Sequence, residues 1–126
     1  GVAPLPGVVA VLRELRHRGY ALGVVTASAK EECRAVLQYV DLLQFFGVVV
    51  TDDDVSRGKP AEDGFLLAAQ ELGVPAERCV VVEDSPRSLQ AAAELGMRTI
   101  GVRNGRQIEF PGAGHVFDTL LEALTA

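Results

Sequence analysis

Hydrophobic and polar positions along the chain follow two patterns, one with helical spacing and one typical of buried strands. Apolar residues recur at helical spacing in several segments, which predicts helices over residues 7–18, 29–40, 62–72, 85–95 and 116–124. Short apolar runs, most of them rich in valine, predict strands over residues 20–25, 48–51, 79–82 and 99–102. Gly19, Gly73 and Gly96 lie where three of the helices are expected to end.

These elements alternate regularly between helix and strand. Because the predicted strands are apolar on both faces, they are expected to lie in a parallel sheet that helices cover on both sides. The predicted fold class is therefore α/β, a Rossmann-like three-layer α/β/α arrangement. No repeat, low-complexity tract or linker divides the sequence, so residues 1–126 are expected to form one domain.

Composition and charge narrow the function without defining it. The apolar fraction of 48% is ordinary for a globular protein, and the formal net charge of −5 argues against a nucleic-acid groove or an anionic membrane as partner. The apolar runs have strand length, so none is expected to span a bilayer, and no secretion signal is evident. Cys33 and Cys79 lie far apart in apolar surroundings and are interpreted as buried thiols. A cytoplasmic protein is the expectation.

Polar residues follow the predicted strands beyond their carboxyl ends, where sheets of this kind usually bind ligands. Thr26, Ala27 and Ser28 come after the first strand and open a helix. A hydroxyl group beside free backbone amides at a helix N-terminus is suited to bind phosphate. The alternative is that these residues only cap the helix.

Two further motifs follow the second and third strands. In Arg57-Gly58-Lys59-Pro60, glycine and proline define an irregular backbone that would hold Lys59 near a phosphoryl group, although a solvated loop lysine fits the same pattern. The adjacent carboxylates of Glu83 and Asp84 are oxygen ligands of the kind that suits Mg²⁺. They are expensive to bury without a cation. Alternatively, Asp84 or Ser85 only caps the helix that follows.

Together and in this order, the three motifs resemble those of the haloacid dehalogenase-like (HAD) hydrolase superfamily. Residues 24–28 are similar to its second motif, residues 58–60 to its third and residues 82–85 to its fourth. Flanking segments fit as well, at residues 6–8, 72–75 and 93–97, so the resemblance extends over essentially the whole chain. It is nearest to the branch of β-phosphoglucomutase and phosphoglycolate phosphatase, in which the Glu-Asp-Ser form of the fourth motif is typical.

The resemblance implies an Mg²⁺-dependent phosphatase or phosphomutase that acts on a small phosphorylated metabolite through an aspartyl-phosphate. Thr26 and the amide of Ala27 would hold the transferring phosphoryl oxygens, and Lys59 would offset negative charge between the phosphoryl group and the nucleophile. Glu83 and Asp84 would hold Mg²⁺ directly or through its waters. Weaker candidates for substrate contact are Ser28 and Lys30.

The sequence departs from the family pattern at its start. The family's first motif, Asp-x-Asp-x-Thr after a strand, supplies the nucleophile and is followed by a helical cap, whereas Gly1 corresponds to the return from that cap. Residues 52–54 have the Asp-x-Asp spacing without the usual continuation, and Asp118 is expected inside the last helix, so neither is interpreted as the nucleophile. The chain is therefore expected to be inactive alone, and its substrate is undefined because the cap selects it.

The first-motif strand of the family lies between the strands that correspond to those ending here at Thr26 and Glu83. Without it, two apolar strand edges are expected to be exposed, which is an aggregation hazard. A missing N-terminal segment, a second copy of the chain or a repacked sheet would have to fill that position.

Two other functional hypotheses remain. A catalytically inactive HAD-like protein could keep the phosphate and metal residues for binding or regulation. A receiver-like signalling domain also combines an acidic pair, a threonine and a lysine around Mg²⁺, but its acidic pair comes early and its lysine last, the reverse of this chain. A phosphatase assay would separate an enzyme from an inactive binding module.

Overall fold

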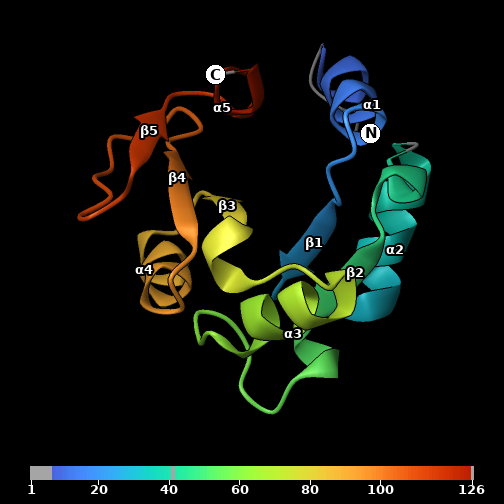
Figure 1. Ribbon diagram of the computed structural model, residues 1–126, viewed down its shortest axis with the longest axis horizontal. Helices are drawn as coiled ribbons and strands as arrows, with labels where there is room; N and C mark the ends of the chain where they lie inside the picture. Colours follow the sequence, from blue (N-terminus) through green and yellow to red (C-terminus); the bar gives the residue numbers. More distant parts are fainter. Residues whose placement is uncertain (1–6, 41, 126) are drawn as a thin grey trace.

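The structure, a computed structural model, describes residues 7–40 and 42–125. Figure 1 shows its elements, which follow one another as α1 (Val8–His17), β1 (Gly23–Thr26), α2 (Lys30–Tyr39), β2 (Val48–Thr51), α3 (Asp63–Leu72), β3 (Val80–Glu83), α4 (Pro86–Glu94), β4 (Arg98–Val102), β5 (His115–Phe117) and α5 (Leu120–Thr125). Short 3-10 helices lie in the connections, at Leu43–Phe45, Asp52–Asp54 and Ala76–Arg78. Gly1 and residue 6 of the first flanking segment lie outside the described residues.

The predicted elements agree with the observed ones within a few residues except near the C-terminus. Residues 116–124, predicted as one helix, instead contain the end of β5 and most of α5. A strand as short as β5 does not define its own period, and it forms because it pairs with β4, with Val116 opposite Gly101. Asp118 therefore follows a strand, and the expectation that it lies inside a helix is wrong.

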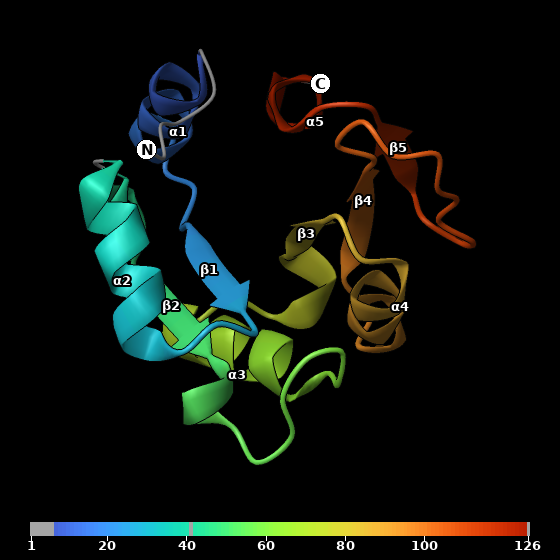
Figure 2. The ribbon, with the colours of Figure 1, turned by 180° about the vertical axis from the view of Figure 1, so that it is seen from behind.

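The described strands form two separate parallel sheets. β1 pairs with β2, and β3, β4 and β5 pair in that order. β1 and β3 are consequently both edge strands, each hydrogen-bonded on one side only. Figures 1 and 2 show these two edge strands facing each other in the middle of the molecule. The expected position for a further strand, between the strands that end at Thr26 and Glu83, is therefore unfilled by the described residues.

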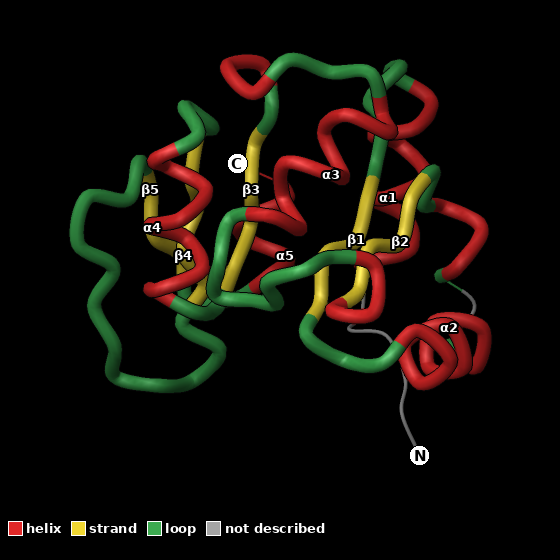
Figure 3. The backbone as a smooth tube through the Cα atoms, turned by 90° about the horizontal axis from the view of Figure 1, so that it is seen from below, coloured by secondary structure: helices red, strands yellow, loops and turns green. Residues whose placement is uncertain are grey.

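Two apolar clusters form the core, and the first of them joins the two sheets. The first is centred on Phe65 of α3 and Ala92 of α4, and both Val25 of β1 and Val81 of β3 pack against it. Figure 3, seen from below, shows α3 between the two sheets. The second cluster joins α1 to Phe45, and side chains of α5 pack against it. The edges of β1 and β3 thus face each other, and two connections hold the sheets together. One is the packing of α3, and the other is the contact of α1 with α5.

Local sequence determines where α4 begins, directly after the acidic pair. The Ser85 side chain accepts a hydrogen bond from the N–H of Ser88 at 3.3 Å, and Pro86 occupies the first helical turn, where its missing N–H is harmless. Ser85 is therefore the cap, as one of the two alternatives for this motif predicted. Asp84 is not needed for capping.

Candidate active site

Lys59 connects the carboxyl ends of the two sheets. Its Nζ lies 2.5 Å from Oε2 of Glu83 at the end of β3 and 3.4 Å from the carbonyl oxygen of Val25 in β1. The ammonium group also lies 5.6 Å from the ring centroid of Phe65, within the range of a cation–π contact. Only 14% of the Lys59 side chain and 10% of the Glu83 side chain are exposed. Lys59 is thus a largely buried cation, and the alternative of a solvated loop lysine is wrong.

Asp52, in the short helix after β2, holds the backbone of Lys59. Its Oδ1 accepts a hydrogen bond from the N–H of Lys59 at 3.0 Å. Gly58 is required for this contact, because a Cβ atom at that position would lie 2.3 Å from Oδ2 of Asp52. The Asp52 carboxylate therefore has a structural role in shaping the loop that presents Lys59.

The next two aspartates attach the start of α2 to the same turn. Oδ2 of Asp53 accepts the N–H of Lys30 at 3.0 Å, and Asp54 pairs with the Lys30 ammonium group. Asp54 also accepts the N–H of Thr51 at 2.9 Å. The hydrogen bond from Lys30 holds the pKa of Asp54 below its ordinary value. Lys30, a weaker candidate for substrate contact, is therefore already engaged by Asp54.

Thr26 ends β1 beside this group and is paired in register with the buried Thr51. Its Oγ1 accepts the N–H of Ser28 at 3.2 Å, which leaves the hydroxyl hydrogen available for donation. The helix α2 begins only at Lys30 and its N-cap residue is Ala29, so the alternative that Thr26 or Ser28 merely caps it is wrong. Ala27 and Ser28 are exposed in the turn before the helix.

Glu83 and Asp84 differ in how strongly their carboxylates are engaged. Oε2 of Glu83 pairs with Lys59, while its Oε1 accepts the N–H groups of Asp84 at 3.2 Å and Ser85 at 3.3 Å. The Asp84 side chain is 54% exposed. Within residues 7–40 and 42–125, no group of three or more His, Cys, Asp or Glu side chains is placed to hold a metal ion. The exposed Asp84 carboxylate could hold an Mg²⁺ ion together with several waters, whereas both carboxylate oxygens of Glu83 already have partners.

A turn after β4 adds two residues to the site that the sequence did not indicate. Nδ2 of Asn104 lies 3.5 Å from Oδ2 of Asp84. Arg106 approaches the same carboxylate oxygen to 4.0 Å and donates a hydrogen bond to the carbonyl oxygen of Asp84. The Asn-Gly pair at positions 104 and 105 is a turn signal in the sequence. Its contact with Asp84 depends on the pairing of β4 with β3, which the sequence does not display.

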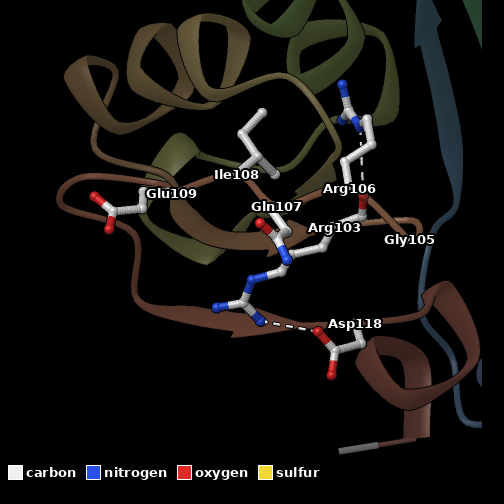
Figure 4. Close-up of a pocket in the computed structure, with 7 residues that line it drawn as sticks. All are labelled: Arg103, Gly105, Arg106, Gln107, Ile108, Glu109 and Asp118. Carbon is white, nitrogen blue, oxygen red and sulfur yellow. Dashed lines mark hydrogen bonds and ion pairs between the residues drawn. The ribbon is translucent and has the colours of Figure 1, made fainter.

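The outer side of this turn is hollowed. A cavity of about 570 Å³ is lined by Asp118 and by residues of the loop from Arg103 to Glu109. Figure 4 shows Arg103 reaching toward Asp118, with 3.0 Å between Nη1 and Oδ1, whereas Arg106 points away from that pair. The residues predicted to bind phosphate and Mg²⁺ are not among those that line this cavity. It therefore lies beside the predicted site and does not form it.

The structure brings most of the predicted site residues to one place. Lys59 contacts Glu83 directly, and it also contacts the carbonyl group of Val25, the residue before Thr26. Asp84 follows Glu83 and faces the turn after β4. These residues lie at the carboxyl ends of β1 and β3, where the sequence predicts them. Their roles in binding phosphate and Mg²⁺ stay predictions.

Two expectations outside the site can also be compared with the structure. Cys33 is buried as expected, whereas Cys79 is only partly buried, and burial raises the pKa of both thiols above the ordinary value. Along the described part of the chain, no helix has both the length and the apolar character needed to cross a bilayer.

Comparison with known proteins identifies the family. The sequence profile of the haloacid dehalogenase-like hydrolase family matches residues 1–102. The chain belongs to this family. Fructose-1-phosphate phosphatase YqaB of Escherichia coli (strain K12) is 42% identical over 102 residues, which are 81% of this chain and 53% of the relative. Validoxylamine A 7'-phosphate phosphatase of Streptomyces hygroscopicus subsp. limoneus is 33% identical over 119 residues, 94% of this chain and 54% of the relative.

A solved structure of similar sequence confirms the fold class. CbbY from Rhodobacter sphaeroides, in complex with phosphate, superposes with a TM-score of 0.87 at 32% identity, covering 97% of this chain and 56% of CbbY. The resemblance inferred from the three motifs and the α/β fold with parallel strands are thus both confirmed. The chain spans about half the length of the curated relatives it matches.

Proposed function

We propose that this chain forms part of the catalytic core of an Mg²⁺-dependent phosphate-monoester phosphatase or phosphomutase. The observation that supports this most directly is the largely buried ammonium group of Lys59 at the carboxyl ends of β1 and β3. A cation held in such a place offsets the negative charge of a transferring phosphoryl group without reorganisation. The names of the relatives, fructose-1-phosphate phosphatase among them, favour a small phosphorylated metabolite as substrate. A cytoplasmic location, where such metabolites are abundant, is part of the proposal.

Each predicted site residue has a role that its surroundings allow. The Thr26 hydroxyl, whose hydrogen is available for donation, and the backbone amide of the exposed Ala27 would bind phosphoryl oxygens next to Lys59. Glu83 orients the Lys59 ammonium group. Asp84, with its exposed carboxylate, would hold Mg²⁺, with Glu83 contributing through water. Bound Mg²⁺ would draw negative charge from the phosphoryl oxygens and so stabilise the transition state.

The proposed reaction begins with in-line attack of an aspartate carboxylate on phosphorus. The bond from phosphorus to the ester oxygen breaks, and the leaving oxygen takes up a proton. Water then attacks the aspartyl-phosphate, releasing inorganic phosphate and regenerating the carboxylate, or a second hydroxyl group accepts the phosphoryl group in a mutase. Asp52, Asp53 and Asp54 all hold structural hydrogen bonds, so the nucleophile is proposed to come from outside the described residues.

The segment that supplies the nucleophile is proposed to be a strand lying between β1 and β3. Both strands have an unpaired edge, and these edges face each other (Figure 1). A parallel strand in this position would be paired on both sides, would remove two exposed edges and would end close to Lys59. An additional N-terminal segment is the favoured source, because the family resemblance places the first motif there. The matched relatives are about twice as long as the region they share, which leaves room for such a segment. A second copy of the chain is the alternative source.

Turnover of an aryl phosphate by three samples tests this function. The samples are the 126-residue chain, the protein at its natural length, and the natural-length Asp84→Asn variant. Activity is expected only in the second, with at most a small residual rate in the first from the remaining electrostatic site. Turnover by the 126 residues alone at the natural-length rate would refute the added strand. Inactivity of the natural-length protein would favour a HAD-like binding or regulatory module instead.

A further inference from the structure

The turn formed by residues 103–106, at the carboxyl end of β4, has a distinctive backbone. Asn104, with φ of 51°, is the one non-glycine residue with positive φ among the described residues, and the next residue, Gly105, has φ of 79°. The N–H of Arg106 donates to the carbonyl oxygen of Arg103 at 3.1 Å and closes the turn. Positive φ at both central residues is the arrangement of type I′ turns, for which Asn-Gly is a preferred pair. The local sequence therefore specifies this turn.

Contacts with the end of β5 anchor the base of the turn. The N–H groups of Arg103 and Asn104 donate to the carbonyl oxygens of Phe117 at 2.9 Å and Asp118 at 3.0 Å. The Arg103 side chain pairs with the Asp118 carboxylate, whereas Arg106 points to the opposite side (Figure 4). The turn thus has one face fixed on β5, while the side chains of Asn104 and Arg106 reach Asp84.

We infer that Asn104 and Arg106 are positioning residues that hold Asp84 in the orientation in which it binds the metal ion. Arg106 fixes the main chain by its hydrogen bond to the carbonyl oxygen of Asp84, and both side chains approach Oδ2. This inference rests on the proposed function, because it requires Asp84 to be a metal ligand. It adds to that function a turn that no motif of the family resemblance includes.

The physical reason is the exposure of Asp84. A carboxylate that is 54% exposed would sample several side-chain rotamers if nothing held it, and metal binding would then have to restrict it. Partners that hold a metal-binding carboxylate in place typically change metal affinity by about 10- to 100-fold when they are removed. Because the contacts to Asp84 are half-exposed, the lower end of this range is expected.

Arg106 has two opposite effects on metal binding, because it holds Asp84 in place but also carries a positive charge. The test therefore needs substitutions that leave the net charge unchanged. The positive guanidinium group near Oδ2 repels a metal cation, and simply neutralising Arg106 would mix the two effects. Asn104→Gly removes the neutral side chain with its amide group, and glycine tolerates the positive φ. Arg106→Lys keeps the charge but loses the planar donor group that reaches the carbonyl oxygen. Arg103→Lys is the matched control, because Arg103 lies in the same turn and contacts Asp118 instead.

The experiment measures the Mn²⁺ affinity of the natural-length protein by the electron paramagnetic resonance signal of free Mn²⁺. The melting temperature without metal shows whether each variant is as stably folded as wild type. Asn104→Gly and Arg106→Lys are each expected to weaken Mn²⁺ binding about tenfold, and Arg103→Lys to leave it within about twofold of wild type. Unchanged affinity in both turn variants, or an equal loss in the Arg103→Lys control, would overturn the inference. Loss of binding in Asp84→Asn supports the proposed metal site separately, and a wild-type protein that binds no Mn²⁺ would overturn both.

Discussion

Replacing Lys59 with methionine is expected to destabilise the protein strongly, because it leaves the Glu83 carboxylate buried without its cation. In the native structure the two charged groups are 2.5 Å apart, and their side chains are 14% and 10% exposed. Methionine keeps an unbranched apolar stem but removes the ammonium group, together with its cation–π contact with the Phe65 ring. Among the described residues, Glu83 then retains the hydrogen bonds from the backbone N–H groups of Asp84 and Ser85.

Breaking a buried ion pair by removing one partner typically lowers the free energy of unfolding by about 3–5 kcal/mol. Because this pair is slightly hydrated, we expect a decrease of about 3 kcal/mol for Lys59→Met. For a chain of 126 residues this corresponds to a decrease in melting temperature of about 12 °C. Converting Glu83 to glutamine in the same protein removes the uncompensated charge, so the double variant Lys59→Met/Glu83→Gln is expected to recover more than half of the loss. The double variant is then much less destabilised than the sum of the losses in the two single variants, and this difference is the interaction energy of Lys59 with Glu83.

Urea denaturation of wild type, both single variants and the double variant measures these free energies of unfolding. Arg103→Met is the control, because its ion pair with Asp118 has side chains that are 39% and 72% exposed. Exposed pairs contribute less than about 1 kcal/mol. If Lys59→Met destabilises the protein no more than Arg103→Met does, the burial argument for Lys59 and Glu83 is wrong.

Further predictions concern the pKa of Asp54 and two glycines, Gly101 and Gly58, at which a side chain would collide with a neighbour. Because Asp54 has a pKa below its ordinary value of 3.8 in the folded protein, its ionised form stabilises the fold above that pH, and this contribution is lost as the pH falls through the folded pKa. The difference in unfolding free energy between wild type and Asp54→Asn should therefore be larger at about pH 6 than at about pH 3. Gly101→Ala is expected to destabilise by about 1–3 kcal/mol, measured in urea, because its Cβ would lie 2.6 Å from the buried Phe110 ring. Gly58→Ala should lower kcat/KM of the natural-length protein about 10- to 100-fold, because its Cβ displaces the Asp52 carboxylate from the loop that presents Lys59, the residue proposed to act in catalysis.

Matched variants make these predictions specific. Ser56→Ala, in the same exposed loop as Gly58, should leave kcat/KM unchanged. Adding Phe110→Leu to Gly101→Ala should restore part of the lost stability, since the smaller side chain makes room for the new methyl group. A pH-independent difference between wild type and Asp54→Asn would contradict the role given to the Lys30 hydrogen bond.

The amino-acid sequence alone determined most of the local elements and the family. Helices such as α3 and α4 repeat apolar residues every three to four positions, and glycines such as Gly73 mark their ends, so these patterns are complete within a dozen residues. The order of hydroxyl, lysine and acidic pair at successive strand ends indicated the HAD family, which comparison confirmed. The Ser85 cap was also readable, because capping involves only near neighbours.

Tertiary structure alone decided which distant groups meet. The separation into two sheets follows from hydrogen bonds between segments far apart in the chain, and the short β5 exists only through its pairing with β4. The same holds for the contact of Lys59 with Glu83, 24 residues apart, and of Arg106 with Asp84, 22 residues apart. Spacing in a sequence reports the period of one element, whereas contacts between elements depend on the register of the sheets that join them.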